Sequence, residues 1–170
     1  PNRPMRGVIG ILTPRDQEEK PWIKNITSRL LERKIDFRIV DPFDPFDPSD
    51  DARLQGLSFL VNRVSDCGSG NIELAKLTHS LLLAAELSQL RVLNGSSAYG
   101  VGQAKLCHHS LLRSCSLATP KSLVVTSPSQ VLEAARRLTP PLLLKPNMAG
   151  FGEGIRAFPT VDSIRAALIQ

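Results

Sequence analysis

The sequence predicts an α/β fold in which a small doubly wound parallel sheet is followed by an α+β unit. Short apolar segments alternate with segments of helical periodicity over residues 7–93, which is typical of a parallel sheet covered by helices. From residue 122 the order becomes strand, helix, hairpin and helix, which indicates a separate α+β unit. We therefore expect two domains, residues 1–115 and 116–170, with the boundary near residues 115–121.

The first domain is expected to hold four strands, each a short apolar run bounded by turn residues. They cover residues 7–12, 37–40, 57–61 and 91–93. Helices are expected from residue 21, over residues 72–87 and over residues 103–113. Glycines at positions 95, 100 and 102 favour irregular structure before the last of these helices.

The second domain is expected to begin with a strand at residues 122–126 and a helix that Ser129 caps. A hairpin of residues 142–144 and 155–158 follows. Thr160 or Asp162 is expected to start a final helix.

Composition excludes several classes of protein. Of the 170 residues, 42% are hydrophobic and 22% are charged, which is typical of a globular chain and not of a disordered tail. Three cysteines, an odd number, fit a reducing cytoplasmic compartment better than a secreted disulfide framework. No apolar run reaches the ~18 residues of a membrane span, and the N-terminus does not resemble a signal peptide. We therefore expect a cytoplasmic protein that does not bind membranes.

The net charge of +5 lies in the second half of the sequence. Residues 1–85 carry 12 basic and 12 acidic side chains, whereas residues 86–170 carry 9 and 4. The basic residues are dispersed and only 5% of residues are aromatic, which argues against nucleic acid as a partner. A small anionic ligand held by particular lysines and backbone groups is the better prediction.

The strongest local motif is residues 142–155, Leu-Leu-Leu-Lys-Pro-Asn-Met-Ala-Gly-Phe-Gly-Glu-Gly-Ile. An apolar strand ends at Lys145, and Gly150, Gly152 and Gly154 follow at every second position before the chain returns as a strand. Glycines allow positive φ and let backbone N–H groups approach an anion closely. We therefore predict a phosphate-binding loop with Lys145 beside it. A plain hairpin tip with a solvated lysine is the alternative.

This motif resembles the small nucleotide-binding subdomain of ATP-grasp ligases, in particular RimK-type and glutathione synthetase-like enzymes. Other segments resemble the same family in the same order, although each is less specific. They are Leu60–Ser65, Asn94, a helix bearing Lys105, Thr119-Pro120 and the strand at residues 122–126. The resemblance implies a pre-ATP-grasp α/β domain followed by the first, truncated ATP-grasp subdomain.

The resemblance implies that Lys105 and Lys145 contact the phosphates of ATP and that Gly150, Gly152 and Gly154 close over them. In the family, ATP and Mg²⁺ activate a carboxylate as an acyl phosphate, which an amine then captures. The substrates would be ATP and a small carboxylate or amino acid. Ala104 and Ala149 depart from the family pattern, where Asp and Gly are common.

The Mg²⁺ ligands of the family are expected downstream of Gln170, so the sequence indicates a fragment of a carboxylate–amine ligase that does not complete catalysis alone. The alternative is a catalytically inactive nucleotide-binding or protein-interaction module. A homo-oligomer is compatible with either.

Arg63 follows a predicted strand, where ligands bind in open α/β sheets. It is expected to bind a substrate carboxylate, or else to form a structural salt bridge.

Asp-Pro-Phe tripeptides in residues 41–49 resemble the peptides that endocytic adaptor appendages bind. Their prolines nevertheless favour a rigid loop whose phenylalanines pack on the domain edge.

Cysteines and histidines do not predict a metal or nucleophile site. Cys107, His108, His109 and Cys115 lack the usual zinc-ligand spacing. His79 is expected at the edge of the core, and no histidine is placed beside the third cysteine, at position 67.

Overall fold

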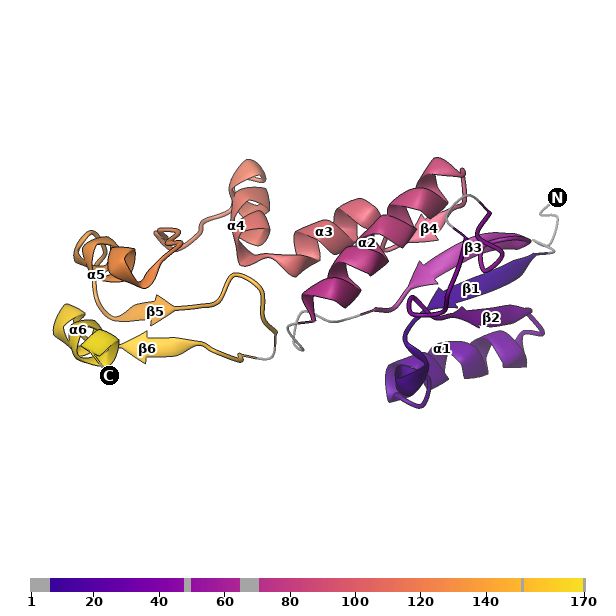
Figure 1. Ribbon diagram of the computed structural model, residues 1–170, viewed down its shortest axis with the longest axis horizontal. Coiled ribbons are helices and arrows are strands. Elements are labelled where there is room, and N and C mark those ends of the chain that lie inside the picture. The colour runs from indigo at the N-terminus through magenta and orange to yellow at the C-terminus, as the bar shows by residue number, and fades with distance from the viewer. Residues whose placement is uncertain (1–6, 48–49, 65–70, 151, 170) are drawn as a thin grey trace. The chain divides into compact units, whose positions relative to one another are not determined.

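The computed structural model describes residues 7–47, 50–64, 71–150 and 152–169. The chain forms two compact units, residues 1–101 (unit 1) and residues 102–170 (unit 2), whose elements are labelled in Figure 1. The boundary predicted near residues 115–121 lies later in the chain. The difference is the helix α4 (Lys105–Ser114), which belongs to unit 2.

Unit 1 is built on a parallel sheet of four strands, as predicted, and the strand order is β2-β1-β3-β4 (Figure 1). The strands are β1 (Val8–Leu12), β2 (Phe37–Val40), β3 (Leu57–Asn62) and β4 (Val92–Leu93). The chain passes from β1 to β2 on one side of the sheet and then to β3 on the other side of β1. The carboxyl ends of β1 and β3 therefore form a topological switch point, the usual place for a ligand in such sheets.

Helices cover both faces of this sheet. Figure 1 shows α1 (Pro21–Glu32) and α2 (Ile72–Leu87) on opposite sides of it. Successive side chains of a strand point to opposite faces, and both Ile11 and Leu12 of β1 are fully buried. The sheet is therefore doubly wound. A short 3-10 helix, η1 (Arg15–Gln17), follows β1.

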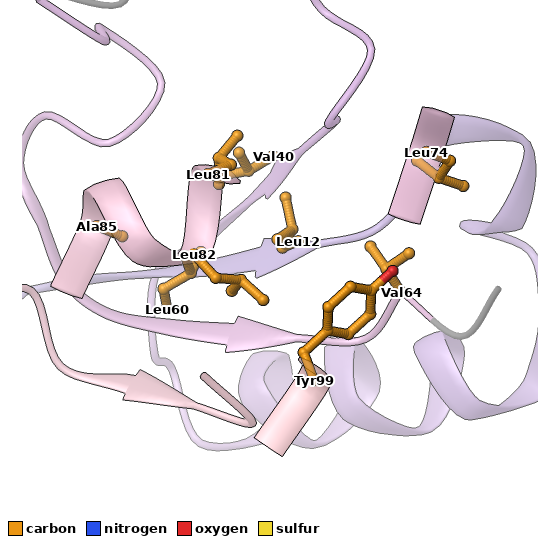
Figure 2. Packing of buried hydrophobic residues seen from close by; sticks show 9 residues of the cluster. All are labelled: Leu12, Val40, Leu60, Val64, Leu74, Leu81, Leu82, Ala85 and Tyr99. Atoms are coloured by element: carbon orange, nitrogen blue, oxygen red, sulfur yellow. The ribbon is translucent and has the colours of Figure 1, made fainter. Parts of the chain in front are cut away.

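The main core of unit 1 lies between the sheet and α2. Figure 2 shows Leu82 of α2 close to Leu60 of β3, with the ring of Tyr99 beside them. Burial of these apolar side chains provides the main stabilisation of the unit. The cluster consists of Leu12, Val40, Leu60, Val64, Leu74, Leu81, Leu82, Ala85 and Tyr99.

A helix that the sequence did not predict, α3 (Ser96–Gln103), follows β4. The expectation of irregular structure there is wrong, because Glu86 of α2 satisfies donors at the start of α3. Its carboxylate accepts hydrogen bonds from the N–H of Ser96, at 3.0 Å, and from the Ser96 hydroxyl. A Cβ at Gly95 would overlap Glu86 Oε1, so a larger residue there would displace this carboxylate.

Unit 2 has a smaller core around an antiparallel hairpin. Its elements are α4, α5 (Pro128–Arg136), β5 (Leu142–Leu144), β6 (Arg156–Phe158) and α6 (Val161–Ile169). The core cluster is Val131, Ala135, Leu142, Phe158 and Ile164. No residue of α4 is buried.

Two predictions for unit 2 are wrong. Residues 122–126 form no strand, because no described segment pairs with them, although Val125 packs on the core. Helix α5 begins at Pro128 after Ser127, so Ser129 is not its N-cap. The N-terminus of α6 fits the prediction, because Thr160 Oγ1 accepts a hydrogen bond from the N–H of Ser163 at 3.1 Å.

Within the described ranges, no helix combines the length and the apolar character needed to cross a membrane.

Candidate functional site

The glycine-rich segment connects the two strands of the unit 2 hairpin. Leu144 of β5 pairs with Arg156 of β6, so the residues between them form one long loop. Within this loop the N–H of Glu153 donates to the carbonyl of Gly150 at 2.9 Å, and the N–H of Ile155 donates to the carbonyl of Gly152 at 3.2 Å. Both bonds join residues three apart, so backbone hydrogen bonds bring the described residues on either side of each turn together.

Two of the glycines are required by the backbone. Gly152 has φ of +80° and Gly154 has φ of +68°, which L side chains rarely adopt. A Cβ at Gly154 would also lie 2.7 Å from Cγ of Pro146, whereas a Cβ at Gly152 would meet nothing within 4 Å. Gly154 is therefore the more constrained position.

The amides of Gly150, Gly152 and Gly154 make no hydrogen bond to any described residue. The turns of the loop engage the intervening amides of Glu153 and Ile155 instead. The loop therefore presents unpaired N–H donors at alternate positions, which is the property that an anion-binding loop needs.

Lys145 lies at the end of β5, where the sequence predicted it. Its side chain is exposed and forms no hydrogen bond or ion pair with the described residues. Its three ammonium donors are therefore available to an anion in solution.

Lys105, the first residue of α4, binds the same loop. Its backbone N–H donates to the carbonyl of Asn147 at 3.0 Å, and its ammonium group donates to the carbonyl of Ala149 at 2.7 Å. The structure thus brings Lys105, Lys145 and the glycines into one unit. The ammonium group of Lys105 keeps two further donors.

Sequence reasoning missed Asn147. Its Oδ1 accepts a hydrogen bond from the N–H of Leu106 at 3.0 Å, so Asn147 caps the N-terminus of α4 from the loop. Ala104, at the N-cap position, has no side chain that can do this. The sequence shows only that residue 104 cannot cap the helix. It does not identify Asn147, 41 residues after Leu106, as the residue that does so.

The charge of unit 2 favours anions. Residues 102–170 carry 8 lysines and arginines against 3 acidic residues, which accounts for the whole net charge of the chain. A net positive charge raises the local concentration of an anionic ligand.

Arg63 lies directly after β3, at the switch point of unit 1. Its backbone N–H donates to the carbonyl of Leu12 at 2.9 Å, which places it beside Thr13 at the end of β1. Nε of Arg63 and Oγ1 of the fully buried Thr13 have no hydrogen-bond partner, and no ion pair to Arg63 occurs among the described residues. The predicted structural salt bridge is therefore absent from this part of the chain.

Side-chain amides fix the neighbouring strand ends. Asn62 Nδ2 donates to the carbonyl of Asn94 at 3.1 Å, and Asn94 Nδ2 donates to the carbonyl of Asn62 at 3.3 Å. Asn62 Oδ1 also accepts a hydrogen bond from the N–H of Val64 at 3.0 Å. The edge of the sheet next to Arg63 is thereby held in one geometry.

The segment with the Asp-Pro-Phe repeat is held by ion pairs and backbone contacts in its described part. Asp41 accepts hydrogen bonds from the N–H groups of Arg15, at 2.9 Å, and Phe43, at 2.8 Å. The guanidinium group of Arg53 donates to the carbonyls of Asp41 and Asp44 at 3.0 Å and lies 3.9 Å from the ring centroid of Phe46. A rigid loop fits these contacts, but its first phenylalanine, at position 43, is 53% exposed and does not pack on the domain edge.

Asp51 pairs with Arg53 at 2.7 Å. Burial raises the pKa of Asp51, but hydrogen bonds from the side chain and the backbone N–H of Arg53, together with its charge, outweigh burial and hold the pKa below the ordinary value.

No group of His, Cys, Asp and Glu in the described ranges could hold a metal ion. Cys107 and Cys115 are free and exposed, and the side chain of His79 is exposed on α2. The cysteine at position 67 lies outside the described residues. The described part of the chain therefore has donors for a polyphosphate but no ligand set for Mg²⁺.

Comparison with known proteins gave matches in structure but not in sequence. No protein-family model and no curated protein matches the chain. The structure of a RimK domain protein ATP-grasp from Sphaerobacter thermophilus matches 95% of this chain and 57% of its own length, with a TM-score of 0.71 at 12% identity.

The chain has the fold of the N-terminal portion of an ATP-grasp protein.

Two further solved structures match the fold of the chain. N5-carboxyaminoimidazole ribonucleotide synthetase from Thermus thermophilus matches 94% of this chain and 43% of its own length, with a TM-score of 0.61 at 19% identity. D-cycloserine synthetase DcsG matches 96% of this chain and 54% of its own length, with a TM-score of 0.57 at 18% identity. The chain therefore spans about half the length of the structures it matches. The predicted fold is confirmed.

Proposed function

We propose that the chain is part of an ATP-dependent carboxylate–amine ligase and that unit 2 binds the phosphates of ATP. The observation that carries this proposal is the loop after β5, where Lys145 precedes three glycines. Neither its ammonium group nor the three glycine amides have a partner among the described residues. Lys105, bound to the same loop, adds a second positive charge. Phosphoryl transfer depends mainly on positioning and on neutralising charge, and these groups supply both.

In the proposed reaction a carboxylate oxygen attacks the γ-phosphorus of ATP, the bond to the bridging oxygen breaks, and ADP leaves. The nitrogen of an amine then attacks the acyl carbon, phosphate leaves, and the amine nitrogen releases a proton. Mg²⁺ would neutralise charge on the phosphates when bound. The residues of unit 2 would hold the polyphosphate chain in place.

The first test is binding of inorganic triphosphate and of ATP by the 170-residue chain, measured by calorimetry. Lys145→Ala should lower the affinity for both about tenfold, because a charge-assisted hydrogen bond is lost. Affinity should also depend less on salt in this variant, because one exposed charge is removed.

Lys121→Ala is the matched control for this test. Lys121 is also in unit 2, but its ammonium group donates to the carbonyl of Arg137 at 3.1 Å and lies outside the glycine loop. If the control and Lys145→Ala change affinity equally, Lys145 is not part of a specific site. If the wild-type chain binds neither triphosphate nor ATP, the proposal is wrong.

We also propose that Arg63 and Thr13 contact the carboxylate of the substrate. They lie at the switch point of unit 1, and Arg63 has no anion among the described residues to offset its charge. A carboxylate can accept hydrogen bonds both from the guanidinium group and from the hydroxyl.

An NMR titration with L-glutamate tests this second site through the Nε–H resonance of Arg63. That resonance is assigned as the one that disappears in Arg63→Lys. The resonance of Arg63 should shift until the site is saturated, while the Nε–H resonance of Arg91, directly before β4, should not shift. Thr13→Val should weaken binding about threefold, as expected for loss of one hydrogen bond. No movement with glutamate, or movement with inorganic phosphate alone, would contradict the carboxylate assignment.

A further inference from the structure

We infer that Asn147 is a positioning residue that holds Lys105 and the glycine loop in the geometry that binds a polyphosphate. The inference rests on the proposed function of unit 2. Asn147 itself lies outside the set of groups proposed above to contact phosphate.

Asn147 binds the start of α4 at two points. Its carbonyl accepts the N–H of Lys105 at 3.0 Å, and its side-chain Oδ1 accepts the N–H of Leu106 at 3.0 Å. These are the first two N–H groups of α4, which have no partner within the helix. Asn147 therefore satisfies donors that Ala104 leaves open, and it joins the loop to the helix.

The attachment fixes the side chain of Lys105. Its backbone is bound to Asn147 and its ammonium group to the carbonyl of Ala149, two residues further along the same loop. Lys105 is thus held at both ends. A lysine side chain held in this way loses less conformational freedom when it binds a ligand.

The same attachment orients an amide of the loop. The carbonyl of Ala149 and the N–H of Gly150 belong to one peptide group, and in a trans peptide they point in opposite directions. A bond from Lys105 to this carbonyl therefore sets the direction of the unpaired Gly150 amide. Asn147 thereby controls both a charge and a donor without being placed at the phosphate itself.

Any substitution at position 147 keeps the backbone carbonyl that accepts the N–H of Lys105. Only the hydrogen bond from the N–H of Leu106 to the side chain can therefore be removed. Asn147→Ala removes the acceptor for the N–H of Leu106, and Asn147→Asp retains it. Met148→Ala is the matched control, since Met148 is the next residue of the loop, is 41% exposed and makes no hydrogen bond through its side chain to the described residues.

Hydrogen exchange of the Leu106 amide tests the attachment without any ligand. Exchange should be faster in Asn147→Ala by about fivefold, the effect of losing one hydrogen bond. It should stay near the wild-type rate in Asn147→Asp and in Met148→Ala. Unchanged protection in Asn147→Ala would overturn the inference whether or not the chain binds ATP.

A double-mutant cycle with inorganic triphosphate tests positioning itself. Lys105→Ala should lower affinity about tenfold in the wild-type chain but only about twofold in the Asn147→Ala background, because the lysine is no longer held. Lys145→Ala should cost the same in both backgrounds. Equal losses for Lys105→Ala in the two backgrounds would contradict positioning, and coupling of Asn147 to both lysines would indicate general loss of structure instead.

The failure of the proposed function would look different from the failure of this inference. If wild type binds no triphosphate while Asn147→Ala still exposes the Leu106 amide, the attachment exists but does not serve phosphate binding, and both proposals are wrong as stated. If wild type binds triphosphate and Asn147→Ala binds it equally well, only the role of Asn147 is refuted.

Discussion

Unit 1 and unit 2 differ in the burial of their cores and in their net charge. Unit 1 has a core of large side chains, among which Leu12, Leu60 and Leu82 are fully buried, and its 13 basic residues are balanced by 13 acidic ones. Unit 2 has a core of five residues, each 4–9% exposed, and carries the entire net charge of +5. Under the functions proposed above, unit 2 would bind the phosphates of ATP, and unit 1 would combine the larger core with the carboxylate site at Arg63.

The largest effect is expected from truncation of the unit 1 core. Leu82→Ala should reduce the free energy of unfolding of unit 1 by about 3 kcal/mol, because it removes buried contacts and leaves a cavity. The adjacent Leu83 is 44% exposed, so Leu83→Ala should cost less than about 1 kcal/mol.

Denaturation followed by intrinsic fluorescence measures this difference in unit 1, because the only tryptophan, Trp22, and the only tyrosine, Tyr99, both lie there. Similar losses for the two variants would mean that α2 does not pack as described. A loss of triphosphate affinity in Leu82→Ala under conditions where the chain is folded would show that phosphate binding depends on the core of unit 1.

A smaller effect is expected in the glycine loop, where binding should change more than stability. Gly154→Ala places a side chain at positive φ and against Pro146, so triphosphate affinity should fall about tenfold. Gly152→Ala introduces backbone strain but no steric overlap, so it should lower triphosphate affinity about threefold.

Calorimetry with inorganic triphosphate ranks the two loop variants, and the fluorescence midpoint of unit 1 serves as the control. The reverse order of the two glycines would contradict the loop geometry. A shift of the unit 1 midpoint would show that the two units do not respond independently.

The smallest effect is a pH dependence in unit 1. Because Arg53 lowers the pKa of Asp51 in the folded state, ionised Asp51 contributes stability above its unfolded value of 3.8, and that contribution is lost as the pH falls through the folded pKa. Urea midpoints of unit 1 should therefore rise more between about pH 3 and pH 6 in wild type than in Asp51→Asn.

Asp162→Asn in unit 2 is the control for this pH dependence. Asp162 pairs with Arg165 at 2.8 Å, but its side chain is 80% exposed, and such surface pairs contribute little. An equal change in the two variants would show that the Asp51 pair has no special role in unit 1.

Elements that a local sequence pattern determines could be predicted from the sequence. The apolar runs at β1, β2 and β3 identified the parallel sheet, and alternating glycines identified the loop. Ser122–Thr126 has the residue types of a strand but finds no partner among the described residues, and strand pairing is a tertiary property.

Long-range capping explains what else was missed. Helix α3 forms across Gly100 and Gly102 because Glu86, ten residues before Ser96, binds its first turn. Asn147 caps α4 from 41 residues away. Helix propensity and local cap rules do not include either contact.

The reciprocal bonds of Asn62 and Asn94 have a consequence for chemical ageing. Asn94 precedes Gly95, and an Asn-Gly pair is the most readily deamidated dipeptide because the glycine amide is unhindered. A larger residue at position 95 would displace the carboxylate of Glu86 from the start of α3. Deamidation would replace a donor to the carbonyl of Asn62 by a negatively charged oxygen facing that carbonyl. Because the hydrogen bond to Asn62 restrains the side-chain amide of Asn94, we expect this asparagine to deamidate more slowly in the folded chain than in the unfolded one.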